Sequence, residues 1–208
     1  MKIEKAKIKL NFIDSILGSM PADPAIYTKF VAAKAPAGWL TNEEILNAKE
    51  LAASKEADFD ADRNVTVFPQ DETGIFLYNY HVKGFLKEAG NVLKDRVKIK
   101  NLRSKLDNYV FVNPRKIYLT RPGGEIVAEE DDVLERPLRG QTARGERITL
   151  VASERVLPPA QIVFTVELIE HKEVTLDTIR AILDYGKYKG LGQWRNGGWG
   201  RFEWREMD

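Results

Sequence analysis

Two segments of the chain alternate between apolar and polar residues, and each predicts a β-strand with one buried face. In residues 6–12 the even positions are apolar and the odd positions are lysine or asparagine. In residues 162–168 the even positions again carry large apolar side chains. Because successive side chains of a strand point to opposite faces, both segments are expected to be half-buried strands. Shorter strands are expected at 65–68, 75–80, 109–112, 117–119 and 148–152, and at the C-terminal end of the chain.

Apolar residues spaced three or four positions apart predict the helices. The clearest stripe occupies residues 82–93 and includes Val92. Thr175 is expected to cap a second amphipathic helix that ends at Gly186. Two more helices are expected, one over residues 25–34 and one that starts at the capping-box sequence Thr41-Asn42-Glu43-Glu44 and ends near residue 54.

The order of these elements predicts the fold class. Residues 107–160 contain several prolines and glycines, among them Pro137 and Gly140, and are interpreted as a loop-rich insertion in which mobility is concentrated. The remaining strands and helices predict a single α+β domain over residues 1–208, with helices on one face of an antiparallel sheet.

Composition narrows the classes of protein that the chain can belong to. It has no cysteine, which excludes disulfides and thiolate metal sites, and its two histidines, His81 and His171, are far apart in sequence. No metal or cofactor is therefore expected. No segment approaches the roughly 20 apolar residues that cross a bilayer, and the first ten residues do not resemble a signal peptide. A cytoplasmic protein with no membrane partner is expected.

The formal net charge of +1 comes from 32 basic and 31 acidic residues, so a basic face requires segregation of charge. One basic run extends from Lys94 to Lys105. A second group, which consists of Arg136, Arg139, Arg144 and Arg147, lies in the glycine-containing part of the insertion. Each group is also compatible with an ordinary solvated surface of mixed charge.

Five glycines occur within the eleven positions from Gly190 to Gly200. Such a density indicates a backbone that adopts conformations forbidden to other residues, or one that lies against a close neighbour. Tryptophan and arginine, which stack on bases and contact phosphates, are interleaved with these glycines. A purely structural alternative is a type I′ hairpin at Asn196-Gly197, with Trp194 directly opposite Trp199.

A second motif is the apolar strand at 75–80 that leads directly into the helix carrying Lys83 and Gly84. Free amides at a helix N-terminus, a lysine and a glycine that permits close approach together indicate a phosphate site. In the alternative interpretation, Gly84 lets a buried helix pack tightly on the sheet.

Taken together, the two motifs resemble the RAMP superfamily of CRISPR-associated RNA-binding proteins, especially its backbone subunits. The segment from Lys83 to Ala89 is similar to the family's strand-to-helix motif, and the pattern from Gly190 to Gly200 is similar to its glycine-rich loop. Strand 6–12, followed by Gly18, is similar to the family's first strand and turn.

The resemblance implies a ferredoxin-like (RRM-like) core with an inserted thumb and a C-terminal glycine-rich loop. It implies a non-catalytic subunit of a CRISPR-type ribonucleoprotein in antiviral defence, which grips guide RNA and assembles with copies of itself or with effector proteins as an oligomer or filament. The residues expected to contact RNA are Lys83, Gly84, Arg139, Arg144, Gly190, Gly192, Trp194, Arg195, Gly198, Trp199, Gly200 and Arg201.

Two alternatives remain open at this point. A phage-encoded mimic of a CRISPR subunit would bind effector proteins and have little affinity for RNA. A metal-independent endoribonuclease would need His81 or His171 as a general acid or base within reach of a partner side chain. No catalytic residue is assigned.

Overall fold

The main sheet is formed by four strands, β1 (Ile3–Phe12), β7 (Val110–Asn113), β11 (Ala160–Ile169) and β12 (Phe202–Met207). Their order is β12-β1-β11-β7, and every neighbouring pair is antiparallel. In β1 and β11 the even-numbered residues from Ala6 to Phe12 and from Ala160 to Leu168 are buried. The two strands predicted from alternation are therefore confirmed.

The structure is a computed structural model that describes residues 2–23, 26, 29, 64–142 and 145–207. The helices expected over residues 25–34 and 41–54 lie outside these residues, except for positions 26 and 29. No helix among the described residues is long and apolar enough to cross a membrane.

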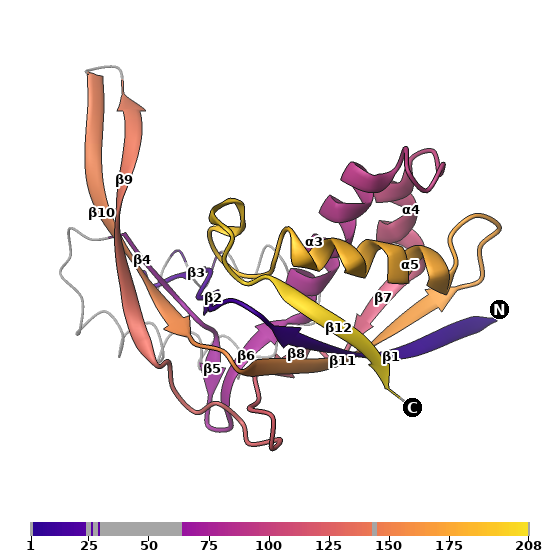
Figure 1. Cartoon of the computed structure of the whole chain (residues 1–208), viewed down its shortest axis with the longest axis horizontal. Helices are drawn as coiled ribbons and strands as arrows, with labels where there is room; N and C mark the ends of the chain where they lie inside the picture. The colour runs from indigo at the N-terminus through magenta and orange to yellow at the C-terminus, as the bar shows by residue number, and fades with distance from the viewer. Residues whose placement is uncertain (1, 24–25, 27–28, 30–63, 143–144, 208) are drawn as a thin grey trace.

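Three α-helices, α3 (Asn79–Leu93), α4 (Leu102–Tyr109) and α5 (Leu176–Leu183), lie on one face of the main sheet (Figure 1). The cap at Thr175 is confirmed, because its side chain accepts a hydrogen bond from the Thr178 N–H. After α5 the chain continues as a 3-10 helix, η1 (Asp184–Lys187). Helix α4 was missed because it buries only Leu102 and Leu106 and overlaps the basic run.

One position of the predicted apolar stripe of α3 is wrong. Val92 is 53% exposed, whereas Val82, Phe85, Leu86 and Ala89 are buried as expected. The contact between α3 and α4 is made at Gly90, where a Cβ atom would lie 2.4 Å from Leu106 Cδ1. Val92 is thereby left on the solvent side of the helix.

The segment 107–160 was expected to be a loop-rich insertion. It instead contains the longest strands among the described residues. Strands β9 (Asp132–Thr142) and β10 (Gly145–Val156) pair along their whole length. Figure 1 shows them as an arm that projects away from the main sheet. Pro137 and Gly140, interpreted as strand breakers, lie inside β9. Proline is tolerated there because β9 pairs on one side only.

The base of β10 belongs to a second, mixed sheet. It pairs antiparallel with β2 (Ile16–Leu17) and parallel with β4 (Asn64–Val67), and β4 pairs with β3 (Met20–Pro21). The strand expected at 65–68 is thus confirmed. A third sheet contains β5 (Gln70–Asp71), β6 (Gly74–Tyr78) and β8 (Lys116–Tyr118).

The buried residue Glu154 connects three of these segments through its carboxyl group and its main-chain oxygen. Glu154 of β10 is 0% exposed, and its Oε2 accepts a hydrogen bond of 2.7 Å from the Phe68 N–H. Its main-chain oxygen accepts one of 2.9 Å from the Gly18 N–H. A Cβ atom at Gly18 would lie 2.5 Å from the main-chain carbonyl carbon of Val67, so only glycine fits against the backbone at the end of β4.

Replacing Glu154 with alanine is expected to destabilise the protein by about 1–3 kcal/mol, because the Phe68 N–H loses its acceptor inside the core. Glu154→Gln keeps an oxygen acceptor on a side chain of similar size, so its free energy of unfolding should fall by less. Urea unfolding of the two variants measures the difference, and equal losses would contradict a role for this hydrogen bond.

Candidate nucleic-acid interface

The glycine-rich loop between η1 and β12 is closed at its base by two glycines in contact. The Leu191 N–H donates to the Gly200 carbonyl oxygen at 3.0 Å. A Cβ atom at Gly190 would lie only 1.9 Å from that same oxygen. Gly192, Gly198 and Gly200 have φ angles of +84°, +88° and +68°. Both reasons for the glycine density, positive φ and close approach, are therefore confirmed.

The type I′ hairpin expected at Asn196-Gly197 is wrong. Residues Arg195–Gly197 form a 3-10 turn, and Trp194 before it is left-handed, with a φ of +54°. Beyond the Leu191–Gly200 hydrogen bond the flanks of the loop are bonded elsewhere, because the Gln193 N–H donates to Leu17 O at 3.1 Å and the Gly200 N–H to Ser15 O at 2.8 Å. The aromatic pair nevertheless forms: the Trp194 and Trp199 rings are stacked, with centroids 6.1 Å apart.

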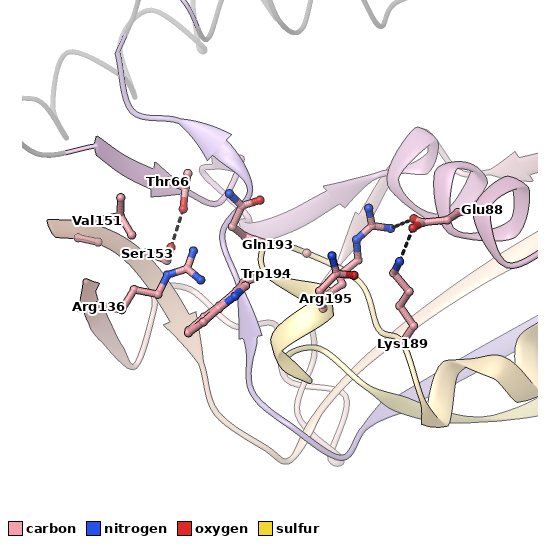
Figure 2. A pocket seen from close by; sticks show the side chains of 12 residues that line it. Thr66, Glu88, Arg136, Val151, Ser153, Lys189, Gln193, Trp194 and Arg195 are labelled. Carbon is pink, nitrogen blue, oxygen red and sulfur yellow. Dashed lines mark hydrogen bonds and ion pairs between the residues drawn. The ribbon is translucent and has the colours of Figure 1, made fainter. Parts of the chain in front are cut away.

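A cavity of about 500 Å³, here called the loop hollow, lies between this loop and the base of the β9–β10 arm. Figure 2 shows side chains from β4, β9, β10, α3 and the glycine-rich loop around it. The residues that line it are Thr66, Glu88, Arg136, Val151, Ala152, Ser153, Lys189, Gly192, Gln193, Trp194, Arg195 and Asn196.

Arg136 of β9 belongs to the basic group noted in the sequence but was not among the residues expected to contact RNA. Its guanidinium carbon lies 3.8 Å from the centroid of the Trp194 ring (Figure 2). Its Nε and Nη1 atoms are buried and have no hydrogen-bond partner among the described residues. Burial lowers the pKa of Arg136 from its usual value. Recognising that residues 132–142 form a strand next to β10 would have directed attention to it.

The opposite end of the loop hollow is an ion-pair cluster centred on Glu88 of α3. Its carboxylate oxygens lie 2.5 Å from Lys189 Nζ and 2.7 Å from Arg195 Nη1 (Figure 2). Although burial raises the pKa of Glu88, the hydrogen bond from Lys189 and the charge of Arg195 bring it below its usual value. Arg201 was also expected to contact RNA. Its Nε atom lies 2.6 Å from Asp14 Oδ2, so it forms an ion pair within the protein.

A second, larger cavity of about 1040 Å³ lies along α3 and is here called the helix hollow. Glu88 lines both cavities, so the two are neighbours. The helix hollow is lined by Asn79, Tyr80, Lys83, Gly84, Lys87, Glu88, Asn91, Arg103, Asp107, Phe111, Val112, Asn113 and Arg115.

Lys83 spans the edge of the main sheet within this hollow. Its Nζ donates to the carbonyl oxygens of Asp107, at 3.0 Å, and of Val110, and lies 5.1 Å from the centroid of the Phe111 ring. Burial lowers the pKa of Lys83 from 10.5 to about 8, although the carboxylate of Asp107 raises it. Lys83 therefore donates a hydrogen bond to the Val110 carbonyl oxygen at the edge strand β7, in addition to lining the cavity.

Gly84 has no neighbouring heavy atom within 4 Å of the place where a Cβ atom would stand. The alternative interpretation, in which Gly84 allows tight packing on the sheet, is therefore wrong. Gly90 makes the close contact of α3 instead. Since glycine weakens a helix interior, a glycine with open space beside it gives the helix no packing benefit. It does leave the backbone of α3 open toward the hollow.

The remaining candidate residues lie elsewhere. Arg139 is on the arm, 74% exposed, with Nη1 3.6 Å from Glu146. Arg144 lies outside the described residues. His171 Nδ1 accepts hydrogen bonds from the main-chain N–H groups of Glu173 and Val174, at 3.0 and 3.2 Å. Within residues 2–23, 26, 29, 64–142 and 145–207, no group of three or more His, Cys, Asp or Glu residues could hold a metal ion.

Comparisons with known proteins give structural similarities at low sequence identity. No protein-family model and no curated protein matches the chain. It is similar to a chain of the Type III-B Cmr-beta complex bound to cognate target RNA, with 10% identity, a TM-score of 0.44 and coverage of 98% of this chain but 60% of that one. It is also similar to a chain of a Type IV-B CRISPR complex, with 10% identity, a TM-score of 0.48 and coverage of 98% and 90%. The functional argument therefore rests on the residues of the two hollows.

The lowered pKa of Lys83 predicts how stability depends on pH. Between about pH 8 and 10.5 the unfolded chain holds a proton on this amine that the folded chain has lost, so the free energy of unfolding should rise with pH across this window. We expect the stability of the wild type to increase relative to that of Lys83→Met over the same range, as measured by denaturant unfolding at each pH. A difference that does not change with pH would contradict the lowered pKa.

Proposed function

We propose that the protein is a non-catalytic RNA-binding subunit of a CRISPR-type ribonucleoprotein, with a RAMP-like, ferredoxin-like core. The observation that carries the proposal is the pair of adjoining hollows, which place cationic side chains, an open glycine and the Trp194 ring along one path. The helix hollow contributes Lys83, Lys87, Arg103 and Arg115, and the loop hollow contributes Arg136, Lys189 and Arg195. Cations along a groove, with aromatic rings beside it, are the means by which proteins hold single-stranded nucleic acid.

The order of elements in the main sheet supports the ferredoxin-like assignment. Along the chain, β1, α3, β7, β11, α5 and β12 follow the sequence β-α-β-β-α-β. The strands are arranged in space as fourth, first, third and second of this series, with all neighbours antiparallel. The β9–β10 arm emerges between the second and third strands of the series, the position of an inserted thumb.

Several cations of the groove are already paired with carboxylates, and RNA phosphates must compete for them. Lys87 Nζ lies 3.0 Å from Asp107, and Lys189 and Arg195 share Glu88. Partly exposed pairs of this kind contribute little to folding, so their exchange for phosphate costs little. We therefore expect RNA binding to be readily weakened by salt.

Filling the open space beside Gly84 tests this function directly. Gly84→Leu should fold, because its side chain enters empty space, and should bind single-stranded RNA at least about tenfold more weakly, since it blocks approach to α3. Fluorescence anisotropy of a labelled RNA, measured at several salt concentrations, gives the affinity. Unfolding experiments on the same samples verify the fold.

Gly123→Leu is the matched control, because Gly123 also has no heavy atom within 4 Å of a Cβ and lies in a turn outside both hollows. Its RNA affinity should equal that of the wild type. If the wild type does not bind RNA even at low salt, the proposed function is wrong. Cleavage of the RNA in the presence of EDTA would point to the endoribonuclease alternative instead.

The internal pairing of the cations and the net charge of +1 favour a second candidate, a protein that takes the place of a CRISPR subunit and binds effector proteins. Such a protein would form a stable complex with purified effector subunits while binding RNA alone weakly. Size-exclusion chromatography of the mixture distinguishes it from the first candidate.

A further inference from the structure

We propose that the loop hollow is a binding site for one phosphate group of the RNA backbone, with Arg136 as its principal ligand. This inference rests on the proposed function and names the place where the strand is held between the arm and the glycine-rich loop. In the sequence Arg136 is one of four arginines of a basic group, and only its surroundings in the structure distinguish it from the others.

The guanidinium of Arg136 is held by its face and leaves its edge available. The Trp194 ring covers the face at 3.8 Å. The N–H donors of a guanidinium lie in its plane and point outward from its edge, so stacking does not occupy them. Nε and Nη1 point to different sides of the guanidinium, and both are buried without a partner among the described residues. The two terminal nitrogens, Nη1 and Nη2, carry parallel N–H donors, and such a pair matches two oxygens of a phosphate.

Burying a cation in this way is unfavourable unless an anion compensates it. Contact with the Trp194 face offsets part of this cost but gives the N–H groups of Arg136 no hydrogen-bond acceptor. No carboxylate lies next to Arg136 in the hollow, because its one acidic residue, Glu88, is paired with Lys189 and Arg195. An anionic ligand would complete the charge balance.

The other polar groups of the hollow are hydrogen-bonding side chains that suit a phosphate. The hydroxyls of Thr66 and Ser153 lie 2.7 Å apart and are bonded to each other, and Figure 2 shows them on the same side of the hollow as Arg136. Gln193 and Asn196 add side-chain amides. Three cationic side chains and one carboxylate leave the lining positively charged.

A phosphate bound here would join two separate parts of the protein. Arg136 belongs to the arm, whereas Trp194 and Gln193 belong to the glycine-rich loop. Binding the RNA backbone would therefore fix the base of the arm relative to the loop.

The test compares the RNA affinity of the wild type, Arg136→Gln, Arg136→Lys and Arg180→Gln at several salt concentrations. Arg136→Gln is expected to bind single-stranded RNA about tenfold or more weakly, and the slope of log affinity against log salt should fall by about 0.7, the value for one lost phosphate contact on a single strand. Arg136→Lys keeps the charge but loses the planar guanidinium, so its affinity should be intermediate and its salt slope close to that of the wild type. Arg180→Gln removes an arginine of α5 outside both hollows and should match the wild type.

The outcomes separate the inference from the proposed function. If the wild type binds RNA and Arg136→Gln binds it equally well with the same salt slope, the inference is wrong and the proposed function stands. If Arg136→Gln does not fold, an Arg136→Lys affinity equal to that of the wild type overturns the inference. If the wild type binds no RNA, it is titrated with inorganic phosphate and with a nucleoside monophosphate. Binding that depends on Arg136 supports the phosphate site and shows that its ligand is a small molecule. No binding of either compound shows that the phosphate site does not exist.

Discussion

The arrangement of the loop hollow depends on the buried residue Glu154. Its carboxyl group accepts a hydrogen bond from the Phe68 N–H just after β4, and its main-chain oxygen accepts one from the Gly18 N–H just after β2. The residues before it, Ala152 and Ser153, form part of the loop hollow. The turn that it holds also supplies Leu17 O, to which Gln193 is bonded. The hydrogen bonds of this one core residue thus link the base of the arm to β4 and to the segment that holds the glycine-rich loop.

The sequence was sufficient to predict the helices and strands that bury one face, because burial leaves a regular apolar pattern. Strands β1 and β11 and the cap at Thr175 were predicted because alternation and capping are local. The arm was misinterpreted because a two-stranded projection buries little, so its residues carry no regular apolar pattern. The exposed Ile148 and Leu150 beside Pro137 illustrate this. Arg136 was missed for the same reason, since its importance comes from a long-range contact with Trp194.

In the glycine-rich segment the local sequence correctly predicted a tight turn and a tryptophan pair but gave the wrong type of turn. Asn-Gly favours a hairpin when the flanking strands can pair. Here both flanks are bonded to the segment between Ser15 and Leu17, and the chain makes a 3-10 turn instead. The stacking of Trp194 and Trp199 survives because it depends on their proximity rather than on the turn type. Tertiary hydrogen bonds therefore decided the conformation.

The contact between Gly190 and Gly200 has an evolutionary consequence. It closes the base of the loop so tightly that neither position accepts a side chain. Because the ends of the loop are fixed independently of its contents, residues around Trp194 to Gly198 can be exchanged or lengthened without moving η1 or β12. Natural variation would then be concentrated at the rim of the hollow, and ligand preference could diverge while the scaffold stays the same.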